Sequence, residues 1–392
     1  QAIMTSTGIS LPIVDGGWST MATISWAWPY AFLMFPLLIA VNVVMILLNK
    51  TNTINADLWN VWLKIFTAVA VVSITHSVIL AFVIAAVQII LELKSSDAHQ
   101  HRIEKLTGIP GVSVTHATLF FGAILYPIAL VLRKIPGLNR EFDTDMLKDK
   151  VGIFAENHVM GFILGCLFGI LAKYSLAQIL TTGIKAAAAM TLFPVVAKYF
   201  MQALSPISEA VSAFMNKKFE GKTLIVGLDW PILGGCNEIW LAILWSIPFM
   251  LIYSMVLPGN EILPFAGLMS ASLALPAFLV TRGNLLQMSI LCVIGAPVFL
   301  WVGTAFAPFM TELAIATGSI DLQAGELISN SLINGPVFTY SISHLFMFLK
   351  GNFMPLIIFA VWLAGFILYY RDLMREARED AALEAGNAKA GQ

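Results

Sequence analysis

Three adjacent polar residues stand at the mouth of an apolar stretch: Glu156, Asn157 and His158 offer a carboxylate, an amide and an imidazole in succession. At the centre of a bilayer an ionisable side chain costs about 2.5 to 3.5 kcal/mol even on a lenient insertion scale, so such groups normally face a cavity or a partner. We interpret the three residues as part of a binding site. The alternative is the interfacial start of a helix, where Glu156 and Asn157 supply acceptors to the first turn.

Other polar residues at breaks in apolar stretches could join this site. Asp229 lies in an Asp-Trp-Pro turn, where it lines the site, caps its own backbone, or does both. His116 has threonine neighbours and no nearby acid, which favours a hydrogen bond to a ligand or to another helix over a metal site. Asn334 and Gly335 precede a proline at a further break. Asp57 is assigned to the membrane interface.

Uncharged polar side chains dominate the predicted cavity, namely Trp18, His116, Asn157, His158 and Asn334. Each buried ligand hydroxyl needs a hydrogen-bond partner, and aromatic faces cover the CH side of a polyol. The lining therefore suits a neutral, hydroxyl-rich solute. The chain has no Walker A, HExxH or GxSxG motif, so it shows no recognisable ATPase, metalloprotease or serine hydrolase machinery, and we expect neither a metal nor a cofactor.

The composition places these residues in a membrane protein. Of the 392 residues 58% are hydrophobic and 11% are charged, whereas a soluble globular protein carries about 25% charge. Lys and Arg number 22 and Asp and Glu 23, so no basic surplus exists for binding nucleic acid. The three cysteines lie far apart, which excludes a disulfide framework and a CxxC pair.

Long apolar stretches predict the helices that position the site. Residues 239–258, 262–281 and 288–311 lack charged residues and are long enough to cross about 30 Å of hydrocarbon. Further candidate spans are 25–48, 58–93, 113–132, 158–171, 176–200 and 353–370. The stretch 58–93 is too long for one upright crossing, so it is either two joined segments or one strongly tilted helix. We expect an all-α polytopic transmembrane protein with about nine to eleven membrane segments.

Two pairs of short segments suggest an internal repeat. Residues 109–116 and 333–340 share Ile, Gly and Thr in register, with Gly111 and Gly335 at equivalent places, and each segment opens an apolar stretch with a helix breaker. The Asp-Gly-Trp loop at 14–18 and residues 227–230 form a second pair in the same order. Such repeats are typical of transporters in which broken helices and re-entrant hairpins line a central cavity. We expect a first repeat at 1–220, a second at 221–370 and a tail at 371–392.

Arginines beside the last span set the predicted orientation. Arg371, Arg375 and Arg378 follow the final apolar stretch, and the positive-inside rule places such a C-terminus in the cytoplasm. The first twenty residues lack the basic and apolar regions of a signal peptide.

Seven segments in order resemble the membrane-embedded IIC component of bacterial galactitol-type phosphotransferase systems, within the wider ascorbate and galactitol group. They are residues 14–18 (Val-Asp-Gly-Gly-Trp), 55–62, 134–140, 154–169, 224–229 (Leu-Ile-Val-Gly-Leu-Asp), 257–265 and 282–285 (Arg-Gly-Asn-Leu). The resemblance extends from about residue 14 to residue 370.

This resemblance implies a homodimeric permease of the bacterial inner membrane that imports an alditol. It also implies IIA and IIB partners, with IIB phosphorylating the solute from a phosphocysteine as it enters, so the donor cysteine lies on the partner. By similarity, the loop from Asp15 to Trp18, Glu156, Asp229 and the tip at Asn334 and Gly335 would form the sugar site. Glu156 would accept substrate hydrogen bonds and serve as the general base.

The chain departs from the family pattern in three places. A hydrophobic segment usually precedes the Asp-Gly-Trp loop, which suggests a shortened chain; His116 is shifted by one place; and Asn157 follows Glu156 where a proline is expected. Two other functions stay open from the residues alone. One is an ion-coupled secondary transporter in which Glu156 carries a proton, and the other is a non-transporting membrane scaffold.

Overall fold

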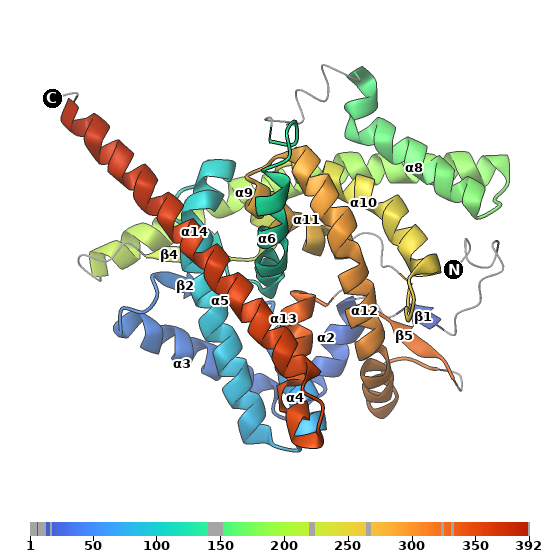
Figure 1. Cartoon of the computed structure of the whole chain (residues 1–392), viewed down its shortest axis with the longest axis horizontal. Coiled ribbons are helices and arrows are strands. Elements are labelled where there is room, and N and C mark those ends of the chain that lie inside the picture. The colour runs from blue at the N-terminus through green and yellow to red at the C-terminus, as the bar shows by residue number, and fades with distance from the viewer. Residues whose placement is uncertain are drawn as a thin grey trace.

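Helices dominate the computed structural model, which describes residue 6 and residues 13–15, 18–139, 152–218, 224–263, 268–322, 325–330 and 333–390 (Figure 1). Five short strands accompany the helices, and each strand has only three or four residues. The chain is an all-α polytopic membrane protein, as its composition predicts. The strands were not predicted.

The elements of the first part run from β1 to α9. They are β1 (Ile13–Asp15), α2 (Trp18–Trp26), the 3-10 helix η1 (Ala31–Leu33), α3 (Met34–Leu47), β2 (Thr53–Asn55), α4 (Val61–Thr75), α5 (Val78–Thr107), β3 (Val112–Val114), η2 (Ala117–Phe121), α6 (Gly122–Leu132), η3 (Gly152–Ala155), α8 (Asn157–Leu171) and α9 (Leu176–Lys218).

The remaining elements, those of the second part, run from β4 to α14. They are β4 (Ile225–Leu228), η4 (Trp230–Leu233), α10 (Asn237–Val256), α11 (Leu268–Thr281), α12 (Leu285–Thr317), β5 (Leu327–Ser329), α13 (Pro336–Ser343), η5 (Leu345–Lys350) and α14 (Met354–Ala390). In both parts a helix of 14 or 15 residues precedes one of 30 or more, and the long helix ends at a left-handed glycine, Gly108 or Gly318.

Among the described residues, five helices are long and apolar enough to cross a membrane, and a bent pair raises this number to six. They lie at Val78–Thr107, Leu176–Val196, Asn237–Val256, Leu285–Thr317 and Met354–Leu383. Four shorter apolar helices of 10 to 17 residues accompany them. The five or six long helices and the four shorter ones together are compatible with the nine to eleven membrane segments expected, and several apolar stretches form short or broken helices.

Two predicted spans show how the breaks arise. The stretch 25–48 was expected to be one helix, but α2 and the segment from η1 through α3 meet at 93°. Pro29 explains this bend, because proline lacks the amide hydrogen that a continuing helix needs. The stretch 58–93 forms two helices, α4 and α5, separated at His76, which adopts φ +56°, and Ser77 caps α5 by accepting from the Leu80 amide.

Each strand pairing joins a strand from the first part of the chain to a strand from the second. Strand β1 of the first part pairs in parallel with β5 of the second, with Asp15 opposite Ser329. Strand β4 of the second part pairs in parallel with β3 and β2 of the first. Strands β3 and β5 each lead directly into a hairpin, so each hairpin is anchored to the other part of the chain.

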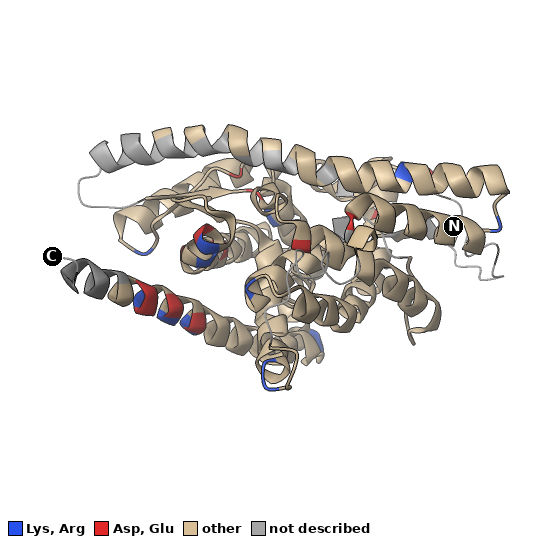
Figure 2. Ribbon diagram, turned by 90° about the horizontal axis from the view of Figure 1, so that it is seen from above, with Lys and Arg blue, Asp and Glu red and all other residues tan. Residues whose placement is uncertain are grey.

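Two features project from the apolar body. Helices α8 and α9 form an antiparallel hairpin along one side, and α14 runs across the body and extends beyond it toward the C-terminus (Figure 1). Charged residues are scarce over the body but gather on the extended part of α14 (Figure 2).

Candidate functional site

The two hairpins predicted to begin at residues 109 and 333 meet at their tips in the structure. Thr118 Oγ1, in the first hairpin, donates a hydrogen bond to Asn334 Oδ1, in the second, at 3.0 Å. Ser272 Oγ of α11 donates to the same oxygen at 2.9 Å. Two donors on Oδ1 orient the Asn334 amide and leave its NH₂ group as a hydrogen-bond donor.

Gly335 allows this close approach. It adopts φ +57°, and a Cβ atom built on it would lie 2.4 Å from the carbonyl oxygen of Ala117. A side chain at this position would therefore both strain the backbone and collide with the first hairpin. Gly111 and Gly335 are aligned in the sequence repeat but lie at different places in the fold. Gly111 precedes β3, whereas Gly335 follows β5 and is the N-cap of α13.

An aromatic cluster holds the two hairpins against α14. The ring centroids of Phe120 and Phe338 are 4.6 Å apart, and those of Phe338 and Trp362 are 4.7 Å apart. Trp362 is fully buried, and its Nε1 donates to the carbonyl oxygen of Phe120 at 2.9 Å. Such edge-on pairs add to the area that the rings bury, so the contact between the hairpins is built into the core.

His116 lies at the start of the first hairpin tip and is 3% exposed. Its Nδ1 accepts a hydrogen bond from the Thr118 amide at 3.2 Å, so in the neutral ring the proton is on Nε2. His116 can therefore present an N–H donor to a ligand. Within the described part of the chain, no group of three or more His, Cys, Asp or Glu residues is placed to hold a metal ion.

Asp229 follows β4 and caps its own turn, because its carboxylate accepts from the Trp230 amide at 2.7 Å. This is one of the two roles predicted for it, and its role in the site stays a prediction. The Asn60 amide group also interacts with Asp229, and the same group donates to both oxygens of Asp57 at 3.1 and 3.0 Å.

A buried charged cluster beside Asp229 was not predicted from the sequence. Lys64 of α4 and Glu92 of α5 form an ion pair of 2.6 Å, and both side chains are fully buried. Gln88 Nε2 donates to Glu92 at 3.0 Å, and Lys64 Nζ lies 3.5 Å from the carbonyl oxygen of Asn60. A lysine within an apolar run was the available signal, because ionisable residues inside membrane helices face partners.

Asp57 belongs to this cluster and is only 5% exposed, so its assignment to the membrane interface does not describe its surroundings. Asp57 and Asp229 both lie in loops outside the helices that could span the membrane. Burial and then the negative charge of Asp57 raise the pKa of Asp229 to about 7, and burial also raises the pKa of Asp57. Two neighbouring carboxyl groups of this kind do not both ionise readily.

Glu156, Asn157 and His158 lie at the N-terminus of α8, which packs chiefly against α9. Glu156 occupies the N-cap position, where no capping hydrogen bond from its side chain is seen among the described residues, and both the site and the helix start stay predictions. Glu156 and Asn157 are half-buried. The three residues are thus on a different hairpin from His116 and Asn334.

The loop from Asp15 to Trp18 is placed only through its backbone. Strand β1 sets Asp15 opposite Ser329, five positions before Asn334. Trp18 begins α2. Residues 16 and 17 and the side chains of Asp15 and Trp18 lie outside the described part of the structure.

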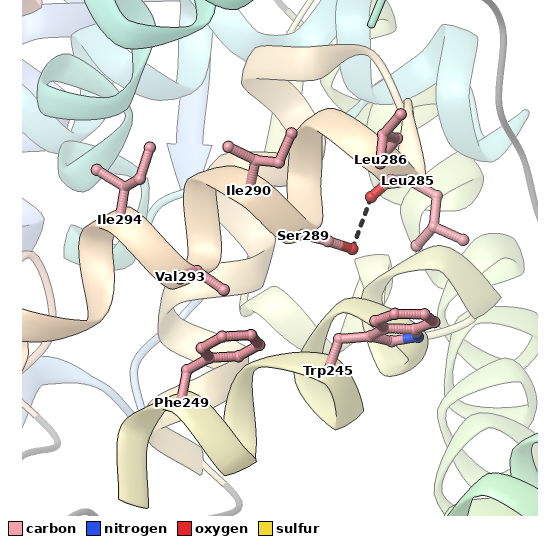
Figure 3. A pocket seen from close by; sticks show the side chains of 8 residues that line it. All are labelled: Trp245, Phe249, Leu285, Leu286, Ser289, Ile290, Val293 and Ile294. Carbon is pink, nitrogen blue, oxygen red and sulfur yellow. Dashed lines mark hydrogen bonds between the residues drawn. The ribbon is translucent and has the colours of Figure 1, made fainter. Parts of the chain in front are cut away.

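A groove of about 430 Å³ lies elsewhere, between α10 and α12. Figure 3 shows Trp245 and Phe249 of α10 facing Leu285, Leu286, Ser289, Ile290, Val293 and Ile294 of α12. Its one hydroxyl, on Ser289, donates to the carbonyl oxygen of Leu285 at 2.8 Å. This apolar lining cannot satisfy the hydroxyls of a polyol, so the groove is not the predicted site.

Comparison with known proteins gives consistent similarities over most of the chain. The EIIC-GAT family, described as the PTS system sugar-specific permease component, matches residues 1–323. The PTS system galactitol-specific EIIC component of Escherichia coli strain K12 is 30% identical over 376 residues, which cover 95% of this chain and 82% of that protein. The protein of the same name from Escherichia coli O157:H7 matches to the same extent.

Proposed function

Because the chain belongs to the EIIC-GAT family of PTS sugar-specific permease components, we propose that it imports galactitol, or a closely similar alditol, across the inner membrane of a bacterium. Import is coupled to phosphorylation by a IIB partner, which IIA recharges. The substrate hydroxyl oxygen attacks the phosphorus of the IIB phosphocysteine, the P–S bond breaks, and the thiolate leaves. The ion-coupled alternative has no support from the relatives.

The contact between Thr118 and Asn334 is the observation that carries this proposal. It joins two hairpins from opposite parts of the chain, and the two residues bonded to Thr118 there carry neutral donors, His116 Nε2 and the Asn334 amide. Donors of this kind match the hydroxyl oxygens of an uncharged polyol. Asp229 supplies a further acceptor, and β1 sets the backbone of Asp15 opposite Ser329, five positions before Asn334.

We assign the site residues as follows on this basis. His116, Asp229, Asn334 and Gly335, with Asp15 and Trp18, form the part of the site at the hairpins. Glu156, Asn157 and His158 form a separate part at the start of α8, where Glu156 acts as the general base once the partner has docked. A base must come within about 3 Å of the hydroxyl that it deprotonates.

The element order supports an internal duplication with a first repeat at 1–220, a second at 221–370 and a tail at 371–392. The pair α4 and α5 corresponds to α11 and α12, and β3 with its hairpin corresponds to β5 with α13. The pairing of β1 with β5 and of β3 with β4 joins the two proposed repeats beside both hairpins, which is consistent with a site formed between repeats.

The charged end of the molecule supports a cytoplasmic C-terminus. Arg371, Arg375 and Arg378 lie on the extension of α14, and Arg102 and Arg282 contact the same extension. Positive charge of this kind is retained on the cytoplasmic side. We further propose that the protein acts as a homodimer, on the strength of the family resemblance.

Uptake into vesicles tests the proposed function. Labelled galactitol, other alditols and a sugar acid would be supplied with and without the purified, phosphorylated IIB partner. We expect galactitol phosphate to accumulate only with the charged partner, and sugar acids to bind less well because the site has no surplus of arginine to pair a carboxylate. Stronger binding of a sugar acid than of any alditol would overturn the proposal.

A further inference from the structure

We propose that Asp57 is a substrate-contacting residue which, paired with Asp229, binds one hydroxyl group of the solute. In this pair one carboxyl group donates a hydrogen bond to the hydroxyl oxygen and the other accepts the hydroxyl hydrogen. The inference rests on the proposed polyol transport, and it adds residues of the β2–α4 loop to a site otherwise built from the hairpins.

Hydrogen bonds join the two acids to the hairpin site. Asn60 holds Asp57 by two bonds of about 3 Å and also interacts with Asp229. The Asp57 amide donates to Asn55 Oδ1 at 2.9 Å, and Thr115, next to His116, donates to the same oxygen at 3.0 Å. Asp57 is therefore linked to Thr115 of the first hairpin through the side chain of Asn55.

The surroundings of the pair favour a proton on one of its two carboxyl groups. Lys64 is the cation facing it from α4, and Glu92 of α5 already pairs with Lys64 at 2.6 Å. His116 of the hairpin accepts at Nδ1 in its neutral form. Two carboxyl groups without a cation of their own share a proton, because both cannot be charged at low cost in a buried site. Such a pair has one donor and one acceptor, as a hydroxyl does.

A buried group without a partner points to a ligand at this place. Among the described residues, Asn55 Nδ2 has no hydrogen-bond partner, and Asn55 is 7% exposed. A buried amide donor in this state is unfavourable and uncommon. Asn55 Oδ1 accepts from the Asp57 amide and from Thr115, so Nδ2 of the same side-chain amide lies close to Asp57 and can donate to a hydroxyl oxygen held by the acid pair.

Binding of labelled galactitol to the protein in lipid nanodiscs, without any IIB partner, tests the pair. The variants are Asp57→Asn, Asp229→Asn and the double variant, all nearly isosteric. Each single variant keeps one donor and one acceptor, so its affinity should stay within about tenfold of wild type. The double variant keeps only neutral amide donors and acceptors, whose hydrogen bonds are about half as strong as those of a carboxylate, so it should bind at least about tenfold less tightly than either single variant.

Asp97→Asn is the matched control, because Asp97 is a largely buried acid that holds Thr51 and Thr53 instead of facing the pair. Thermal unfolding and size-exclusion chromatography establish that each variant is folded. Double-variant affinity equal to that of the control would overturn the inference. Loss of binding by either single variant equal to that of the double variant would also overturn it.

The wild-type protein gives a second test that needs no variant. Since the pKa of Asp229 is raised to about 7, the singly protonated pair becomes rare above neutral pH, and galactitol affinity should fall about tenfold between pH 6 and pH 8. An affinity independent of pH would contradict the shared proton. Failure of the wild-type protein to bind galactitol or any other alditol would instead reject the proposed function.

Discussion

Gly335 is the residue on which the contact between the hairpins depends most directly. We expect Gly335→Val to weaken galactitol binding at least tenfold, because the new Cβ would lie 2.4 Å from the Ala117 oxygen. The backbone strain at φ +57° adds about 1 to 3 kcal/mol to the cost in stability. Nanodisc binding and thermal unfolding measure the two effects, and membrane insertion should be retained.

The variant Gly318→Val distinguishes the effect of backbone strain from the effect of a steric clash with the first hairpin. Gly318 adopts φ +61°, but a Cβ there would meet nothing within 4 Å. This control should lose stability and keep its affinity for galactitol. Gly111 has φ +70° but lies before β3, so Gly111→Val should affect binding less than Gly335→Val. Equal affinities of the Gly335 and Gly318 variants would remove the case for a site at the hairpin tips.

Glu156 distinguishes three mechanisms at the level of one side chain. Glu156→Gln keeps the size and one acceptor but cannot take up a proton. If Glu156 is the general base, the variant should bind galactitol with modest loss and be phosphorylated by the charged partner about 10² to 10⁴ times more slowly. If it only stabilises the helix start, the change should cost about 1 kcal/mol or less. Near-normal phosphorylation would rule out the catalytic role.

Helices were predicted best where the apolar pattern is long and continuous. Residues 239–258 and 288–311 correspond to α10 and α12. Short strands could not be predicted, because three residues carry too weak a pattern and their partners are more than 100 residues away in sequence. The contact of Thr118 with Asn334 was equally beyond reach, since hydrogen bonds between distant hairpins depend on the packing of the whole chain.

The hairpin of α8 and α9 depends on glycines spaced four residues apart. Gly161, Gly165 and Gly169 face α9, and a Cβ at Gly165 would lie 2.7 Å from the Thr182 carbonyl oxygen. Small residues at this spacing let two helices approach closely. We expect Gly165→Leu to destabilise the protein by about 1 to 3 kcal/mol in thermal unfolding. Phosphorylation should fall with it, because Glu156 begins the same helix.

Ile163→Leu is a suitable control, since Ile163 lies on α8 and is 45% exposed. Galactitol binding to the hairpin tips should be nearly unchanged in both variants. A Gly165→Leu protein as stable as the control would show that α8 and α9 do not pack through these glycines.

On the scale of the whole molecule, α14 connects its own charged C-terminal extension to the two hairpins. Its inner face carries Asp372, Glu376 and Asp380, which pair with Arg102, Lys105, His101 and Arg282. Arg102 is 2% exposed and also donates to the Leu279 carbonyl oxygen at 3.2 Å. The same helix carries Trp362, which packs against Phe120 and Phe338 of the two hairpins.

Arg102→Met tests whether α14 transmits its attachment to the site. Removing one partner of a buried ion pair costs about 3 to 5 kcal/mol, and here Asp372 and Glu376 would keep only the exposed cations Arg375 and Arg282. Arg375→Met is the matched control, since Arg375 is 68% exposed and its ion pairs should contribute about 1 kcal/mol or less. We expect the Arg102 variant alone to show a large fall in unfolding temperature. Because Trp362 and Asp372 lie on one continuous helix, loosening α14 should also weaken the contact between the hairpins and reduce galactitol affinity. An Arg102 variant that loses stability yet binds galactitol as well as the control does would show that the hairpins hold together independently of α14.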